Sequence, residues 1–219
     1  TLDATGTVAL SVDDNAAITS NVVAAALAIS ASSGTVAGAL GVSVALAENT
    51  ITGSSRAAID GSEVTATGGA SDVTVDATAM NTIDSVAAAA SFALSATSGT
   101  VALSGAGSGA IARNITTNQV LTEIVDASVD AGGAVAATLT DNSSIKADTA
   151  SVAASVAISS GVALSGVVAV TLADNQIGGT YRASISDSDV DALSGGVTVS
   201  AFADNSIDAL SLAVGISVS

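Results

Sequence analysis

Cysteine, histidine and proline are absent from this chain of 219 residues, and aromatic side chains make up only 1% of it. Without cysteine there is no disulfide framework, no thiolate nucleophile and no zinc site built on sulfur. Without cysteine and histidine, neither a Ser-His-Asp nor a Cys-His triad can form. We therefore interpret the chain as a non-enzyme with no catalytic residue and no cofactor, apart from the calcium considered below.

Positive charge is also scarce. The chain has 20 acidic residues and four basic ones, Arg56, Arg113, Lys146 and Arg182, and its net charge is -16. Such a surface repels phosphate backbones, which excludes nucleic acid as a partner. The chain starts at Thr1 without a basic and apolar signal segment, so we expect it to be a fragment of a larger or processed protein.

A unit of 62 to 65 residues repeats through the whole chain. Its landmarks return in the same order, and one series of isoleucines is spaced by 65, 62 and 62 residues: Ile18, Ile83, Ile145 and Ile207. No linker interrupts the repeat, which predicts one continuous domain over residues 1–219. The units run approximately over residues 15–80, 81–141 and 142–204, with a partial unit at 205–219.

Each unit has two half-units of different character. The first is an almost charge-free run of Ala, Val, Ser and Gly, broken once at Ser33-Gly34, Ser98-Gly99 or Ser160-Gly161, and the second carries the acidic residues and short alternating strands. In the second half-unit, period-two alternation places Val64, Ala66 and their equivalents on one face and the acidic residues on the other.

These features predict an all-β fold, a repetitive β-solenoid or parallel β-helix. Gly, Ser, Thr and alternate β-branched residues disfavour helix. Coils of about 31 or about 21 residues both fit the repeat, and each apolar half-unit could instead be a long hairpin bent at its Ser-Gly. The recurring large apolar residues are predicted to be buried: Ile51, Ile59, Val64, Val73, Ile83, Ile115, Ile124, Val135, Ile145, Ile177, Ile185, Val197 and Ile207.

The pattern of an Ala-x-Ile strand, a Ser-x-Val-x-Ala strand and a Gly-rich turn into Val-x-Val-x-Ala is repeated at Arg56–Ala77 and Arg182–Ala201. It resembles the repeats of large bacterial filamentous haemagglutinin-like and leukotoxin-type adhesins. The resemblance covers essentially the whole chain. It implies a parallel β-helix, a secreted or cell-surface location and a structural or adhesive role, with a host or cell-surface ligand as a further partner.

Asparagine recurs every 28 to 34 residues, at Asn15, Asn49, Asn81, Asn114, Asn142, Asn175 and Asn205. Asn tolerates turn conformations and bonds to its own backbone, so an internal ladder or a set of turns explains the series. Acidic residues precede five of these asparagines. If these acidic residues stack on one another, a calcium site at the edge of the solenoid is an alternative to plain turns. Its ligands would be Asp14, Glu48, Asp141, Asp174 and Asp204.

A glycan-binding or polysaccharide-cleaving β-helix domain is the alternative function. Arg56 and Arg182 occupy equivalent positions two units apart, but a sugar platform needs aromatic residues, and Phe92, Tyr181 and Phe202 are the only three. Gly105-x-Gly107-x-Gly109 lacks a strand-to-helix context, which indicates a glycine-rich turn or bulge and not a phosphate site.

Residues 22–47, 85–112 and 151–172 carry no charge and are long enough to cross a bilayer. Frequent Ser, Gly and Thr and the lack of basic flanks disfavour a membrane span. Small apolar residues occupy both odd and even positions of these runs, so we expect both strand faces to be covered. Lateral or end-to-end packing against identical chains, as in a filament, would cover them; another layer of the same chain is the alternative.

Overall fold

The computed structural model describes all residues from 1 to 219 and contains fifteen β-strands and no helix. Every strand pairs in parallel with the equivalent strand one repeat away, and four such ladders run through the chain. Ile83, for example, lies between Ile18 and Ile145 in register. The predicted parallel β-solenoid is confirmed.

The four sheets contain equivalent strands of successive coils. Sheet A contains β1 (Leu2–Ala4), β5 (Glu63–Ala66), β9 (Ser128–Ala131) and β13 (Asp189–Ala192). Sheet B contains β2 (Val8–Asp14), β6 (Val73–Ala79), β10 (Val135–Asp141) and β14 (Val197–Ala203). Sheet C contains β3 (Ala17–Ser32), β7 (Thr82–Thr97), β11 (Ser144–Ile158) and β15 (Ser206–Val218). Sheet D contains β4 (Val36–Asp60), β8 (Val101–Val125) and β12 (Val162–Ser186).

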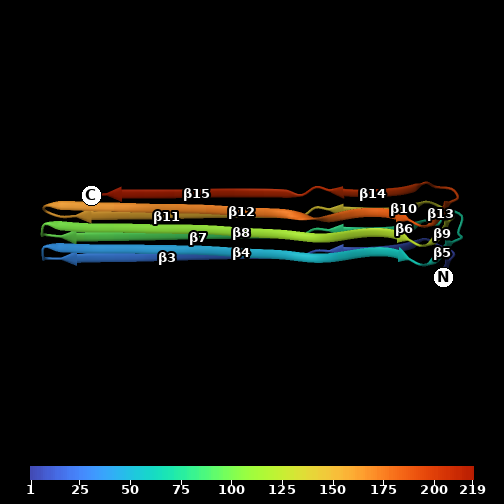
Figure 1. The fold of residues 1–219 in the computed structure, drawn as a ribbon, viewed down its shortest axis with the longest axis horizontal. Coiled ribbons are helices and arrows are strands. Elements are labelled where there is room, and N and C mark those ends of the chain that lie inside the picture. Colours follow the sequence, from blue (N-terminus) through green and yellow to red (C-terminus); the bar gives the residue numbers. More distant parts are fainter.

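One coil takes a whole repeat, because the chain passes through all four sheets before it returns to the first. The predicted coil lengths of about 31 and about 21 residues are both wrong. The strands of sheet D have 25 residues each, so the molecule is about 80 Å wide at 3.3 Å per residue, whereas neighbouring coils rise by only about 4.8 Å. Figure 1 shows this wide, flat stack, with all the long strands running side by side.

The predicted break at Ser33-Gly34 is the bend at which β3 turns back into β4. The two strands do not form a hairpin, since β3 pairs with β7 and β4 pairs with β8. Sheets C and D instead face each other. The equivalent bends stack closely: a Cβ on Gly99 would lie 2.0 Å from the carbonyl oxygen of Gly34, so only glycine fits there.

The conventional hydrophobic core lies at one end of the molecule, between sheet A, sheet B and the last third of sheet D. We call this end the base. Val and Ile side chains fill it, and Val73, Val120 and Ile124 are fully buried. The predicted alternation is confirmed here, with Val64 and Ala66 inside and Glu63 outside. Most of the residues predicted to be buried are so: Ile51, Ile59, Val64, Val73, Ile83, Ile124, Val135 and Ile145.

Five residues depart from that prediction. Ile115 pairs with Thr50 and Gln176, whereas Thr116 pairs with Ile51, so the middle repeat is one residue out of step and Ile115 turns outward. Val197 and Ile207 are each 49% exposed because they belong to the last, incomplete coil, which nothing covers. Ile177 and Ile185 are only partly buried, and they pack against the buried clusters.

Away from the base, sheets C and D form a thin two-layer arm with small side chains between them. Buried alanines such as Ala45, Ala87 and Ala110 fill this layer. Ser43 on β4 donates a 2.8 Å hydrogen bond across it to the carbonyl oxygen of Ala90 on β7. Because the sheets are this close, the interior of the arm holds no side chain larger than its two valines, Val22 and Val167.

Candidate functional site

The arm consists of residues 22–47, 85–112, 149–173 and 211–218. None of these residues is charged, so all 20 acidic and all four basic residues of the chain lie outside the arm. In Figure 1 the arm occupies the part of the stack that ends at the bends. Charge and apolar surface are therefore segregated along the strands.

The arm has large apolar side chains on its outside. On the outer face of sheet D, which we call the D face, alternate residues of β4 point to solvent, and Leu40 is 73% exposed and Val44 61% exposed. The intervening residues, such as Ala45, are buried. This is the reverse of a usual strand, in which the larger apolar residue is inside.

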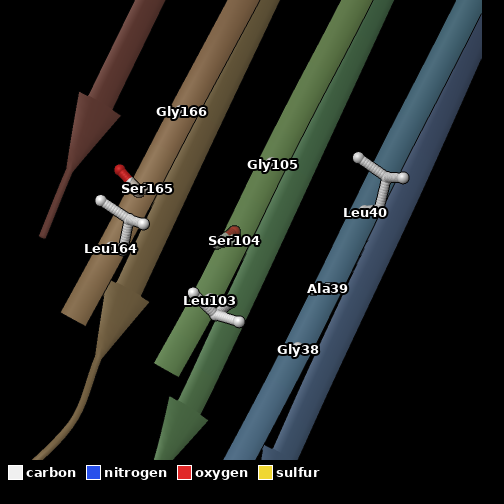
Figure 2. A pocket seen from close by; sticks show the side chains of 9 residues that line it. All are labelled: Gly38, Ala39, Leu40, Leu103, Ser104, Gly105, Leu164, Ser165 and Gly166. Atoms are coloured by element: carbon white, nitrogen blue, oxygen red, sulfur yellow. The ribbon is translucent and has the colours of Figure 1, made fainter. Parts of the chain in front are cut away.

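Glycines interrupt this apolar surface on the central strand. Gly105, Gly107 and Gly109 lie within β8 and pair with Leu40, Val42 and Val44 of β4, which corrects the predicted turn or bulge. A groove of ≈ 620 Å³ runs past Gly105. Figure 2 shows Leu40, Leu103 and Leu164 standing on the same side of the sheet around it.

The outer face of sheet C, which we call the C face, is apolar too. Leu27 on β3 and Phe92 on β7 are neighbours in register, and they are 70% and 37% exposed. Alanine and not glycine occupies the small positions of this face, as at Ala25 and Ala90. The C face has a smaller hollow of ≈ 360 Å³, which lies between Leu27, Phe92 and Val152.

The same-chain alternative is confirmed for one face of each apolar run, and packing against identical chains remains a prediction for the other face. The other layer of the same chain covers the small-residue face of each run. The opposite face, with the larger side chains, has no cover within the chain. The sequence signal of this arrangement is an alternation of size in residues 36–47, and it is easily missed because both sizes are apolar.

The predicted asparagine ladder forms for three of its seven members. Asn49 donates from Nδ2 to Oδ1 of Asn114 over 2.8 Å, and Asn114 donates in the same way to Asn175 over 2.7 Å. The other four lie at the bend between sheets B and C. There Oδ1 of Asn81 and Oδ1 of Asn205 accept backbone N–H groups of the neighbouring coil, whereas the remaining two face solvent: Asn15 and Asn142.

The proposed calcium ligands are not brought together. Glu48 and Asp174 lie outside sheet D on either side of Arg113, which is 3.7 Å from the first carboxylate and 3.6 Å from the second. Asp14 and Asp141 belong to sheet B and are separated by the intervening strand, and Asp204 is exposed at the end of the stack. No group of three or more acidic residues is placed to hold a metal ion.

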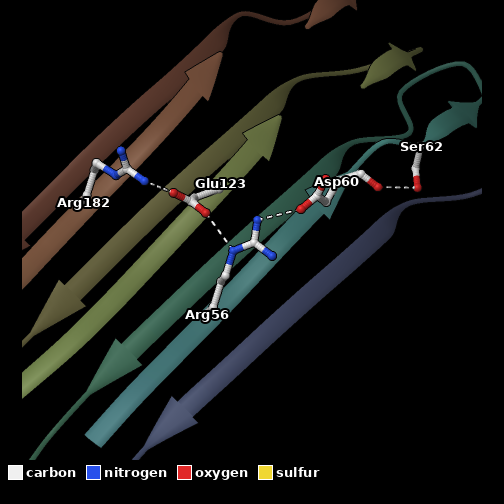
Figure 3. A network of polar contacts seen from close by, with 5 residues as sticks. All are labelled: Arg56, Asp60, Ser62, Glu123 and Arg182. Carbon is white, nitrogen blue, oxygen red and sulfur yellow. Dashed lines mark hydrogen bonds and ion pairs between the residues drawn. The ribbon is translucent and has the colours of Figure 1, made fainter. Parts of the chain in front are cut away.

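Arg56 and Arg182 are bound to one carboxylate. Glu123 lies on the middle coil, and Arg56 donates to it from Nε over 2.7 Å, while Arg182 approaches the other oxygen from the next coil. Figure 3 shows this cluster, with Asp60 also bound to Arg56. The hydrogen bond from Arg56 lowers the pKa of Glu123 despite its burial, and the charge of Arg182 lowers it further. The two arginines form a structural ion cluster, which weighs against their use on a sugar.

A buried polar cluster, which the sequence did not indicate, lies where the arm meets the base. The amide of Asn118 is buried without a hydrogen-bond partner of good geometry, between Gly53 and Gly179 of the neighbouring coils. Tyr181 lies beside the buried Asp141. Burial, together with this carboxylate, raises the pKa of Tyr181 to about 12. None of the five cavities of the molecule is lined by Asn118, Tyr181 or Asp141.

The structure contains no helix that is long and apolar enough to span a membrane. Comparisons with protein family models, with curated proteins and with solved structures gave no match. The exposed apolar faces of the arm are the most unusual surface of the molecule, and we take them as the candidate functional site.

Proposed function

We propose that this chain is a structural repeat module of a secreted or cell-surface filamentous bacterial protein, and that it associates laterally with identical chains. The observation that supports this best is the pair of outer apolar faces on the arm. Contiguous exposed apolar surface of more than a few hundred Å² is rare on monomeric proteins and marks an interaction site. Each face extends over about 35 Å of strand and three or four neighbouring strands, about 500 Å² by the spacing of strands and residues.

The location rests on the resemblance of the repeats to filamentous haemagglutinin-like adhesins. In such a role the rigid, acidic base would keep the assembly soluble and the arms would join neighbouring filaments. A host or cell-surface ligand remains part of this proposal as a further partner of the assembled surface.

Sedimentation velocity over a range of concentrations tests the association. We expect the apparent mass to rise above 20.5 kDa with concentration. Leu27→Lys on the C face and Val44→Lys on the D face should reduce the association. Thr52→Lys is the matched control, because Thr52 is exposed on β4 but lies outside the arm. A 20.5 kDa monomer at every concentration would contradict the proposal.

A further inference from the structure

We infer that the D face is a self-complementary interface, through which two copies of this chain pair face to face about a two-fold axis parallel to the strands. The inference rests on the proposed self-association and names its surface and geometry. It starts from the pairing of large and small residues on β4 and β8.

Glycine and a large side chain alternate between these two strands in register. Gly38 pairs with Leu103, and Leu40 pairs with Gly105. Val42 pairs with Gly107 and Val44 with Gly109 in the same way. In each of these four rows, one coil therefore carries a projection where its neighbour has a hollow.

A two-fold axis along the strands, placed between the first and second coils, brings these features together. It keeps the strand direction, reverses the order of the coils and sets β4 of one copy opposite β8 of the other. Leu40 then enters the hollow at Gly105 of the second copy, and Leu103 enters the hollow at Gly38. The symmetry repeats each contact, as an isologous interface requires.

Charge at the end of the face agrees with the same arrangement. Glu48 and Arg113 form the next pair of the register at the border between arm and base. The two-fold axis places Glu48 of each copy opposite Arg113 of the other. Both side chains are more than half exposed, so the contact would add a second partner to the ion pair that they form within one chain.

Other arrangements are less complementary. With antiparallel strands and coils in the same order, large residues of β4 oppose one another, as at Leu40 and Val44, and the glycines of β8 face an empty space. On the C face, rows between β7 and β11 also alternate in size, as at Ala90 with Val152 and Phe92 with Ala154. The small residue in these rows is alanine and not glycine, so the C face has a hollow of ≈ 360 Å³ against ≈ 620 Å³ on the D face. The glycines therefore favour the D face and the parallel orientation.

The size of the overlap sets the expected strength. Because the axis lies between the first and second coils, β4 and β8 of each copy meet the other copy, whereas β12 stays outside the contact. From Val36 to Glu48 the contact extends about 40 Å, and two strands give it a width of about 10 Å. Two copies would bury about 800 Å², the range of weak and transient interfaces, so we expect a dimer that forms reversibly at high protein concentration.

Single cysteines test the geometry, because the chain has none of its own. Proteins carrying Leu40→Cys and Gly105→Cys are prepared separately, mixed and oxidised. We expect a disulfide between the two chains. Leu40→Cys mixed with Gly109→Cys is the matched control, since Gly109 lies four residues, about 13 Å, further along the strand. Equal cross-linking of both mixtures would overturn the proposed register.

Substitutions that fill the hollows distinguish this specific interface from non-specific association of apolar surfaces. Gly107→Val/Gly109→Val adds apolar surface, and the monomer tolerates it, because Val36, Val101 and Val162 already stack in register on this face. We expect the dissociation constant of the dimer to rise at least tenfold. Ala88→Val/Ala90→Val adds the same groups to the C face and should leave dimerisation unchanged.

The outcomes distinguish the two proposals. If the wild type associates and Gly107→Val/Gly109→Val associates equally or more strongly, the D-face interface is wrong while lateral association stands. If the wild type is a monomer at all concentrations, both are wrong. If it stays monomeric and floats with phosphatidylcholine vesicles, the occupant of the face is lipid, which also overturns the inference.

Discussion

Asn49 donates a hydrogen bond of 2.8 Å from its Nδ2 to the Oδ1 of Asn114, one coil further along the stack. Asn114 is fully buried, and its Nδ2 donates an equivalent hydrogen bond to the Oδ1 of Asn175. The ladder therefore joins all three complete coils of sheet D at the border of the arm. An amide that both donates and accepts is required at the middle position.

We expect Asn114→Ala to lower the free energy of unfolding by about 2–3 kcal/mol, because it removes two hydrogen bonds of the ladder and leaves Asn49 with Ser85 as its remaining partner. Asn118→Ala is the matched control. The side-chain amide of Asn118 lies on the same strand and is equally buried, but it makes no hydrogen bond that the substitution could remove. It should cost less than about 1 kcal/mol. Urea denaturation measures both, and equal losses would show that the ladder contributes nothing.

Stability should fall in acid because of Glu123. Its hydrogen bond from Arg56 lowers its pKa in the folded state. The stabilisation is thus present above the ordinary pKa of about 4.3 and is lost as the pH falls through the lower folded value. We expect Glu123→Gln to be less stable at pH 7 and to lose less stability on acidification than the wild type. Glu63→Gln, at an exposed residue without an ion pair, should keep the wild-type profile.

Tyr181 is the only tyrosine of a chain without tryptophan, so its ionisation can be followed by absorbance alone. Its pKa is raised to about 12, chiefly by burial and then by Asp141. The folded state holds this proton more tightly, so stability is complete below the ordinary pKa of about 10 and falls as the pH rises towards 12. Asp141→Asn should lower the pKa of Tyr181, and Asp208→Asn should not. A wild-type titration at the ordinary value would contradict the buried environment.

Calcium binding remains a prediction, and the structure makes a large effect unexpected. Arg113 already lies between Glu48 and Asp174, and the other candidate ligands are apart. A ligand of the folded state raises the melting temperature by mass action. We expect less than about 1 °C between millimolar calcium and chelator by scanning calorimetry. A rise of several degrees would show that the acidic residues rearrange around the ion.

The solenoid itself could be predicted from the sequence, because the same residues return at each repeat. The exact register of the repeats could not be predicted. Ile115 was expected to be equivalent to Ile51, but Thr116 pairs with Ile51 instead. A shift of one residue moves every side chain of a strand to the opposite face. Because the length of the repeat itself varies by two or three residues, the sequence spacing does not reveal such a shift. For the asparagine series the sequence left a ladder and plain turns as alternatives, and the ladder forms where Asn49, Asn114 and Asn175 occupy the same inward position.

The length of the coil and the outward faces of the arm could not be predicted. Pairing partners lie a full repeat apart, so the sequence gives their period but not how many bends lie between them. In residues 36–47 both faces are apolar, and which face is inside depends on how closely two sheets approach. Gly41 shows this: a Cβ there would lie 2.9 Å from the carbonyl oxygen of Phe92.

Thiol labelling at two neighbouring residues of β4 tests the arrangement of the arm most directly. Val44 is 61% exposed and Ala45 is fully buried, and the chain has no other cysteine. In dilute solution, Val44→Cys should react at nearly the rate of a free thiol and Ala45→Cys at least a hundredfold more slowly. At high concentration Val44→Cys should become protected as the D faces meet. Fast labelling at position 45 with protection at 44 in the dilute monomer would contradict both the fold of the arm and the surface that we assign to it.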